Sequence, residues 1–163
     1  MARRSLIFLT LSRLAKLAPL LTLVYFMGLV YALLYPFQFS LPDSHKPFLS
    51  FNMLNTGAVP YLVKNSNRID IMANIILFAP FGAFLYAWLQ ARIQSSTQAI
   101  LCAVIAAGLV SVGCEAIQFF EPARDSAIFD VGSNVIGAAA GAISCWFWFL
   151  LAEKLRSTRK LVQ

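Results

Sequence analysis

Residues 131–152 read VGSNVIGAAAGAISCWFWFLLA and contain no Asp, Glu, Lys or Arg. A helix of about 20 apolar residues is long enough to cross the hydrocarbon core of a bilayer. Three further uncharged runs of similar length precede this one, at residues 17–42, 71–91 and 93–114. The sequence therefore predicts an all-α integral membrane bundle of four transmembrane helices.

The composition agrees with lipid as the solvent of this chain. Of its 163 residues, 60% are hydrophobic and 12% are charged, whereas soluble domains are about half apolar and a quarter charged. The mean hydropathy is +0.73. Cys102, Cys114 and Cys145 all fall inside the apolar runs, so no disulfide framework is predicted. The length favours a single domain.

The first apolar run has a second interpretation, as a cleaved signal peptide, because basic residues precede it. That run is longer than the usual signal core of roughly 7 to 15 residues, and no Ala-x-Ala site follows it before the chain turns polar. The pattern favours an uncleaved first helix. The predicted divisions are a basic N-terminus at 1–16, a transmembrane domain at 17–152 and a basic tail at 153–163.

The basic residues predict the orientation of the bundle. Four spans place both termini on one side, and that side holds nine Lys and Arg: Arg3, Arg4, Arg13, Lys16, Arg92, Lys154, Arg156, Arg159 and Lys160. The other side holds four: Lys46, Lys64, Arg68 and Arg124. Cytoplasmic loops carry the excess of Lys and Arg, so both termini are predicted to be cytoplasmic. The charge of +6 is then a topology signal, and no nucleic-acid partner is predicted.

Most acidic residues lie on the predicted outer side, beside amides at helical spacing. Six acids are placed there: Asp43, Asp70, Glu115, Glu121, Asp125 and Asp130. Residues three or four apart share a helix face, which defines three stripes: Asp70/Asn74, Ser111/Glu115/Gln118 and Asp130/Asn134. The sequence predicts that these stripes meet in one polar cluster at the outer ends of three helices, with Arg124 in the loop between two of them.

Glu115 is the central candidate of this cluster. A carboxylate within a membrane span is expensive and is regarded first as functional, and Arg124 is its expected partner. Glu115 and Asp130 are the catalytic candidates. The ligand-binding candidates are Arg124, Gln118, Asp70, Asn74, Asn134 and Ser111. The alternative is a purely structural clamp that holds helix ends together.

Two other segments have predicted roles. Gly137 and Gly141 belong to a stripe of small residues that permits close approach of helices; packing within the chain is favoured, and a homodimer is the alternative. The loop at 36–68 is rich in Phe and Pro and is expected to lie on the outer membrane surface over the polar cluster.

No cofactor is predicted. His45 is the only histidine, which argues against a multi-histidine metal site. A divalent cation bound by the outer carboxylates is left open, because hard cations take oxygen ligands. The chain shows no phosphate-cradling glycine loop and no serine nucleophile elbow.

The order of the polar and small residues resembles a known family. It reads Asp70-x3-Asn74-x2-Leu77-Phe78-x-Pro80-x-Gly82, Ser111-x3-Glu115-x2-Gln118-Phe119, Pro122-x-Arg124 and Asp130-Val131-x2-Asn134-x2-Gly137-x3-Gly141. Over residues 68–141 this resembles the VanZ-like family of small bacterial membrane proteins. The family's namesake is associated with low-level resistance to the glycopeptide teicoplanin, which implies a role at the cell envelope and a place in the bacterial cytoplasmic membrane. Many members carry an acid three positions after the motif arginine; here that position is Ala127, and only the acid at six positions, Asp130, is present.

Two functions remain open from the sequence. The first is binding or modification of a phospholipid or lipid-linked envelope precursor at the outer leaflet, with Arg124 pairing its phosphate or carboxylate and Glu115 or Asp130 acting as general acid or base. The second is a non-catalytic accessory or scaffold protein. Transport is least favoured, because it needs polar groups near the bilayer midplane, and these lie at one end.

Overall fold

The computed structural model describes residues 2–41, 65–122 and 128–160, and the side chains of 16–41, 69–122 and 128–155. Its elements are α1 (Ala2–Leu34), α2 (Asn65–Gln90), α3 (Ser96–Gln118) and α4 (Ile128–Lys160). Each contains a segment long and apolar enough to cross a membrane: Lys16–Leu34, Ile69–Gln90, Ser96–Gln118 and Ile128–Leu155. Only helices satisfy every backbone donor and acceptor within one such segment in lipid. Over the described residues, the predicted all-α fold is confirmed, with four helices that are long and apolar enough to span a membrane.

Several helix ends differ from the boundaries of the uncharged runs, among them the ends of α1 and α4. α1 ends at Leu34 rather than near residue 42, because Pro36 disfavours helical backbone at Tyr35. Phe37 then adopts a positive φ of 62°, which turns the chain off the helix axis. α4 continues to Lys160, beyond residue 152, because Glu, Lys, Leu and Arg in this segment are good helix formers. An uncharged run therefore does not fix a helix end: the run at 17–42 continues past the end of α1, and α4 continues past the run at 131–152.

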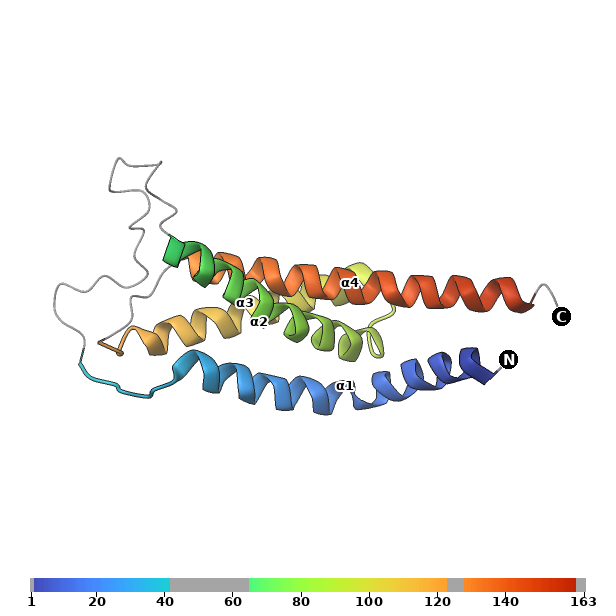
Figure 1. Ribbon diagram of the computed structural model, residues 1–163, viewed down its shortest axis with the longest axis horizontal. Helices are drawn as coiled ribbons and strands as arrows, with labels where there is room; N and C mark the ends of the chain where they lie inside the picture. Colours follow the sequence, from blue (N-terminus) through green and yellow to red (C-terminus); the bar gives the residue numbers. More distant parts are fainter. Residues whose placement is uncertain (1, 42–64, 123–127, 161–163) are drawn as a thin grey trace.

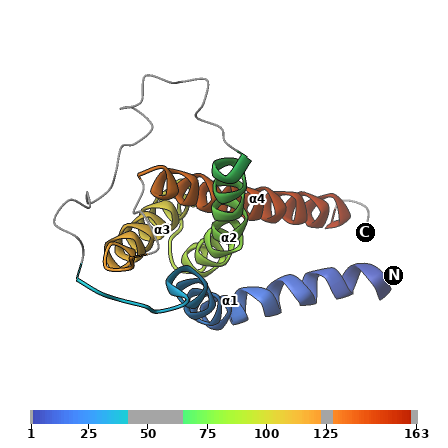
Figure 2. The same ribbon diagram turned by 60° about the vertical axis from the view of Figure 1, so that its left-hand side comes forward.

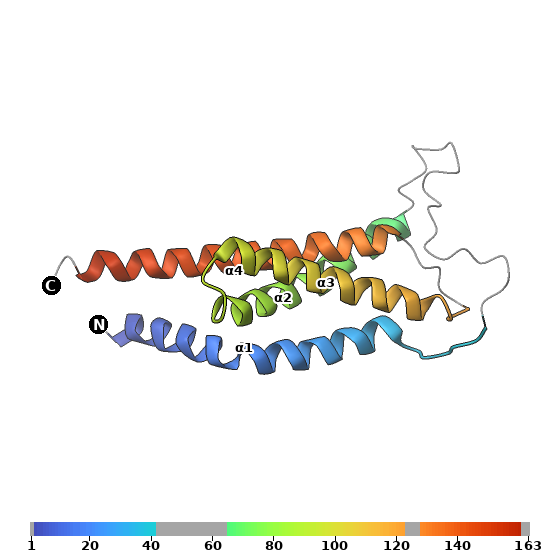
Figure 3. The same ribbon diagram turned by 180° about the vertical axis from the view of Figure 1, so that it is seen from behind.

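The helices run alternately between two ends of the bundle. α1 begins and α4 finishes at one end, which we call the terminus end; the opposite end, where α1 and α3 finish, we call the loop end (Figure 1). Seen from behind, α4 continues well past the α2–α3 turn at the terminus end (Figure 3). Ser95 caps α3 at that turn by accepting a hydrogen bond from the backbone N–H of Gln98. Which end faces the cytoplasm stays a prediction.

α2 and α4 run parallel and make the most extensive helix contact of the bundle. Three glycines bring the backbones together, in the pairs Gly82–Ala138, Gly137–Ile75 and Gly141–Ala79. A Cβ atom placed on any of these glycines would overlap the partner's backbone, so only glycine fits. We call this contact the glycine seam. It lies within one chain, and a homodimer through Gly137 and Gly141 stays an unfavoured alternative.

The remaining helices pack around this pair. α2 lies between α4 and α1 (Figure 2), and the Tyr25 hydroxyl of α1 donates a 2.8 Å hydrogen bond to the Leu77 carbonyl of α2. The interior is built largely from small residues, with Ala103, Ala107 and Ala138 fully buried. Large apolar side chains point outwards instead: Leu20, Leu23, Val24, Met27, Ile105, Leu109 and Ile136. This outward apolar surface suits lipid.

Candidate functional site

The predicted cluster lies at the loop end, where a hydrogen bond joins α2 to α4. The Asn74 side-chain amide donates to Asp130 Oδ1 at 3.0 Å. Both side chains are half-buried. The Ser133 hydroxyl, one turn along α4, donates to the backbone carbonyl of Asp130 at 3.0 Å. Two residues that the sequence placed in separate stripes are thus direct partners.

A second hydrogen bond joins α4 to α3. Asn134 Nδ2 donates to Ser111 Oγ at 2.8 Å. Asn134 is 3% exposed and Ser111 is fully buried, so this bond is shielded from solvent. Together the two amide bonds connect α2, α4 and α3 at neighbouring depths.

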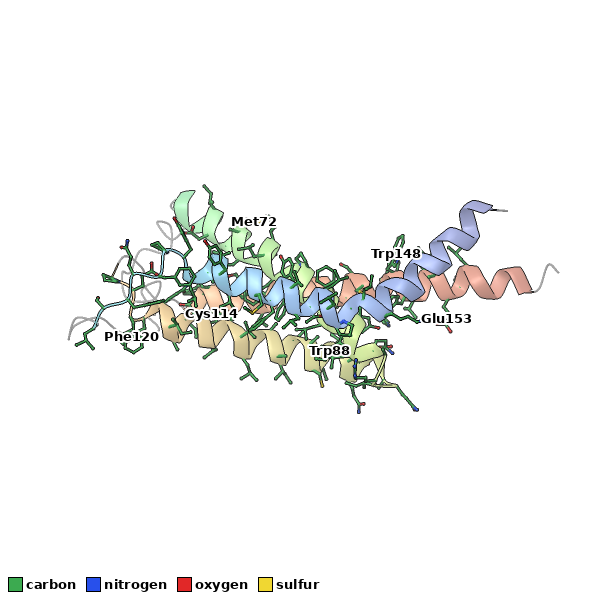
Figure 4. All side chains as sticks on the ribbon, turned by 90° about the horizontal axis from the view of Figure 1, so that it is seen from below. Met72, Trp88, Cys114, Phe120, Trp148 and Glu153 are labelled. Carbon is green, nitrogen blue, oxygen red and sulfur yellow. The ribbon has the colours of Figure 1, made fainter. Side chains whose placement is uncertain are left out.

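Helix geometry places Glu115 beside this connection. α3 and α4 run antiparallel, and the Asn134–Ser111 bond sets their register. Four residues advance about 6 Å along a helix, so Glu115 on α3 lies level with Asp130 on α4. Glu115 is buried, at 4% exposed, and it interacts within the protein. Cys114, its neighbour, lies in the loop-end part of α3, far from Trp88 at the terminus end (Figure 4).

Gln118 ties α3 to the end of α1 rather than to α4. Its side-chain amide donates a 2.6 Å hydrogen bond to the Leu33 carbonyl. That carbonyl belongs to the last turn of α1, where carbonyls lack partners within the helix. The buried Gln118 amide supplies one. Gln118 therefore connects the end of α3 to the end of α1.

Two predicted site residues are not part of these contacts. Asp70 is exposed at the start of the α2 span. Its ligand-binding role stays a prediction, for a side chain outside the buried cluster. Arg124 lies outside the described residues, and its pairing with Glu115 stays a prediction.

Glu121 is a buried acid that the sequence analysis did not select. It is 1% exposed and interacts within the protein. A turn after α3 positions it, because its backbone N–H donates to the Gln118 carbonyl at 2.9 Å. The helical spacing of the α3 stripe could have identified Glu121. It follows Gln118, the last residue of the Ser111/Glu115/Gln118 stripe, by three positions. The stripe on α3 extends one turn further than its helix.

An apolar hollow of about 400 Å³ adjoins this end of α3. It is a shallow, largely open depression and is lined by Phe39, Ser40, Leu41, Ile117 and Phe120. The Ser40 backbone N–H donates to the Phe120 carbonyl at 2.8 Å, which holds the segment after α1 against the end of α3. This described part of the 36–68 loop therefore lies against the end of α3, and coverage of the polar cluster by the loop stays a prediction.

The donor set of the cluster consists of oxygens and amides. Among the residues that the structure describes, no three His, Cys, Asp or Glu side chains are placed to hold a metal ion together. Buried carboxylates beside amides and a hydroxyl are able to bind cations, donate or accept protons, or hold helices together. The contacts define a polar network that joins three helices at neighbouring depths.

The fold and this network define a multi-pass membrane protein with a buried polar cluster at one end of its bundle. The family model VanZ/LLP1 matches residues 22–150, and the chain belongs to this family. The match includes all three stripes and the glycine seam. Neither the search of curated proteins nor that of solved structures found a match.

Proposed function

We propose that this VanZ/LLP1 protein resides in the bacterial cytoplasmic membrane and binds an anionic amphiphile at its loop end, which faces the outer leaflet. The amphiphile is a phospholipid or a lipid-linked envelope precursor. The nine-to-four asymmetry of Lys and Arg supports this orientation. The proposal extends to a role at the cell envelope and in glycopeptide resistance of the teicoplanin type, because the namesake of the family is associated with that resistance.

The observation that carries the proposal is an apolar hollow beside a buried polar turn. Ile117 and Phe120 line the hollow, while Gln118 and Glu121, from the same stretch of chain, are buried. An amphiphile has the same two parts, an acyl chain and a polar head group. Ligand sites combine an apolar lining with a few polar groups that fix orientation in this manner.

Arg124 is the proposed partner of the head group. A guanidinium engages phosphate or carboxylate oxygens through two parallel hydrogen bonds. Glu115 and Asp130 are the proposed acid and base if the bound amphiphile is also modified. Lipid binding alone requires neither of them to transfer a proton.

The alternative function is that of an accessory or scaffold protein with a structural clamp. The bonds Asn74–Asp130 and Asn134–Ser111 favour it, because each joins two helices directly. A clamp accounts for the amides and for Asp130. It does not account for an apolar hollow at the same end.

Mass spectrometry of lipids that copurify with the protein tests the proposal. Ile117→Trp fills the hollow and is expected to reduce the bound lipid by about tenfold. Ile105→Trp is the matched control, because Ile105 is another exposed isoleucine of α3 but lies outside the hollow. Equal amounts of the same lipids on both variants and on the wild type would contradict specific binding.

Function is tested at matched membrane abundance with Arg124→Lys and Glu115→Gln. Lysine keeps the positive charge of Arg124 but cannot form two parallel hydrogen bonds. We therefore expect reduced function of Arg124→Lys in a glycopeptide-resistance or envelope-stress assay. Normal abundance with lost function supports the binding site. Full function of both variants supports the clamp.

A further inference from the structure

α1 continues beyond the bundle at the terminus end. The ring centroids of Phe26 on α1 and Phe81 on α2 lie 6.1 Å apart, and these two helices run antiparallel. α2 ends nine residues after Phe81, whereas α1 begins 24 residues before Phe26. Residues 2–16 therefore extend about 22 Å past the end of α2. The lipid-crossing part of α1 begins at the same level, at Lys16.

α4 also continues beyond the bundle at this end. Its Phe149 ring lies 6.0 Å from the Tyr86 ring of α2, and these two helices run parallel. α2 ends four residues after Tyr86, whereas α4 continues for eleven residues after Phe149. Residues 154–160 therefore extend about 10 Å past the end of α2, in agreement with Figure 3. We call residues 2–16 and 154–160 the basic extensions.

The basic extensions carry positive charge alone. They contain no Asp or Glu and eight basic residues: Arg3, Arg4, Arg13, Lys16, Lys154, Arg156, Arg159 and Lys160. Arg92 is exposed in the α2–α3 turn at the same end. Trp88 and Trp148 lie at this end of their helices (Figure 4), and Trp is typical of the head-group level of a bilayer. The charge complements an anionic partner at or beyond that level.

The composition of residues 2–16 points to a membrane surface as this partner. Six large apolar residues lie between the basic ones: Leu6, Ile7, Phe8, Leu9, Leu11 and Leu14. Helices that combine Lys and Arg with Leu and Phe lie in the plane of the membrane interface, with apolar residues at the acyl boundary. A soluble polyanion complements the charge but provides no apolar environment for these six residues.

A bend in α1 inclines its extension to the bundle axis. Pro19 lies inside α1, and proline kinks a helix because it lacks a backbone N–H and its ring clashes with the preceding turn. The Thr22 hydroxyl donates to the Ala18 carbonyl at 2.7 Å, and bonds of this type also bend helices. The N-terminal part of α1 turns away from the axis of the rest (Figures 2 and 4). This inclination suits a helix at a membrane surface.

We propose that the basic extensions and Arg92 bind anionic phospholipid head groups in the leaflet at the terminus end, with residues 2–16 in the head-group layer. The lipid phosphates pair with Lys and Arg, and anionic leaflets attract such basic segments beside a membrane span. This surface lies at the opposite end of the bundle from the proposed amphiphile site and does not depend on it. Basic residues that served topology alone would bring no preference for anionic lipid.

The lipid selectivity of the purified full-length protein tests this proposal. The protein is mixed with equimolar phosphatidylglycerol and phosphatidylcholine in detergent micelles, and the lipids retained after detergent exchange are counted by mass spectrometry. Phosphatidylglycerol is expected to be enriched at least about fivefold, the contribution of one basic residue at an anionic surface. A triple variant with Arg3→Gln, Arg4→Gln and Arg13→Gln is expected to lose most of this enrichment.

Two control variants separate this surface from the rest of the protein. A second triple variant, with Lys46→Gln, Lys64→Gln and Arg68→Gln, removes the same charge from the predicted outer side and should keep the enrichment. Ile117→Trp, which fills the apolar hollow at the loop end, should also keep it. A failure of the amphiphile proposal is therefore distinguishable from a failure of this one.

Three results of the retention assay would overturn the proposal. The first is equal retention of both lipids by the wild type. The second is an enrichment in the Arg3/Arg4/Arg13 variant as large as in the wild type. The third is binding of heparin, a soluble polyanion, without a preference for phosphatidylglycerol, because it would assign the basic extensions to a soluble partner.

The position of the first extension is measured without removing any basic residue. A polarity-sensitive fluorophore is attached to Ser12→Cys after Cys102, Cys114 and Cys145 are replaced by alanine. Its emission should lie at shorter wavelength in nanodiscs that contain phosphatidylglycerol than in nanodiscs of phosphatidylcholine alone. Sodium chloride at about 1 M should reverse this shift, because it reduces the screening length to about 3 Å. The same emission in both kinds of nanodisc would contradict a charge-dependent position in the head-group layer.

Discussion

The amide of Asn74 on α2 donates a 3.0 Å hydrogen bond to the carboxylate of Asp130 on α4, at the loop end of the two helices that the glycine seam holds together. The seam sets the distance between the helix axes through backbone contact. The side-chain bond adds a specific pairing of residues, which fixes how the helices are aligned. The two features together make α2 and α4 the structural centre of the bundle.

The Asn74–Asp130 bond is expected to show energetic coupling. In a double-mutant cycle of Asn74→Ala and Asp130→Ala, the coupling should be about 1 kcal/mol, typical of the stronger interhelical hydrogen bonds in membrane proteins. Unfolding in mixed micelles measures it. Asp70→Ala, at an exposed acid of the same helix, should change the free energy of unfolding by less than about 0.5 kcal/mol. Purely additive single and double variants would exclude the bond.

The glycine seam predicts a difference between two glycines of α4. Gly141→Ala should reduce the free energy of unfolding by about 1–3 kcal/mol, because the new Cβ overlaps the Ala79 backbone. Gly132→Ala should be neutral or stabilising by up to about 1 kcal/mol, since its Cβ meets no atom within 4 Å. The same unfolding assay compares them. Wild-type stability of Gly141→Ala would disprove the close contact.

Gln118 is expected to fasten α1. Gln118→Leu removes the donor to the Leu33 carbonyl and should reduce the free energy of unfolding by about 1–2 kcal/mol. Gln98→Leu, at an exposed position near the start of α3, serves as the control and should have little effect. Thermal unfolding of the purified variants provides the comparison. A similar effect of both substitutions would show that the bond contributes nothing specific.

The orientation is tested by cysteine labelling after Cys102, Cys114 and Cys145 are replaced by alanine. A membrane-impermeant maleimide should label Ser66→Cys in intact cells and Gln163→Cys only after permeabilisation, because the terminus end carries the basic excess. Labelling of Gln163→Cys in intact cells would reverse the orientation and remove the argument for an outer-leaflet site.

The lipid-crossing segments could be predicted from the sequence because charge is excluded from hydrocarbon. The uncharged run at 71–91, for example, nearly coincides with the Ile69–Gln90 segment of α2. The uncharged run at 17–42 does not by itself mark the end of α1, because residues 35–41 are uncharged without being helical. The loop predicted from residue 36 does agree with a helix that ends at Leu34. Hydropathy indicates which segments are compatible with the hydrocarbon core of a membrane. The end of a helix depends instead on local backbone geometry, here at Pro36 and Phe37.

The composition of the polar cluster was predictable, but its pairing was not. Spacing put Asn74 with Asp70 and Asn134 with Asp130, on single helix faces. The structure instead pairs Asn74 with Asp130 across two helices. Periodicity within one helix identifies a face, whereas partners across helices depend on the register of packing. Glu121 was missed because the stripe continues into a turn after the helix has ended.

The tightest contact of the bundle joins its second helix to its last, and this constrains the order of events during biosynthesis. Gly82 on α2 has its partner Ala138 only after α4 has left the ribosome, and Ser111 on α3 likewise waits for Asn134. Until then, a nascent chain with three spans carries unassembled polar groups within the membrane. A chain truncated after residue 127 is therefore expected to be degraded as an unassembled substrate of membrane quality control, with a half-life in pulse–chase measurements much shorter than that of the full chain. Equal half-lives of the truncated and full chains would show that the first three spans are stable before α4 arrives.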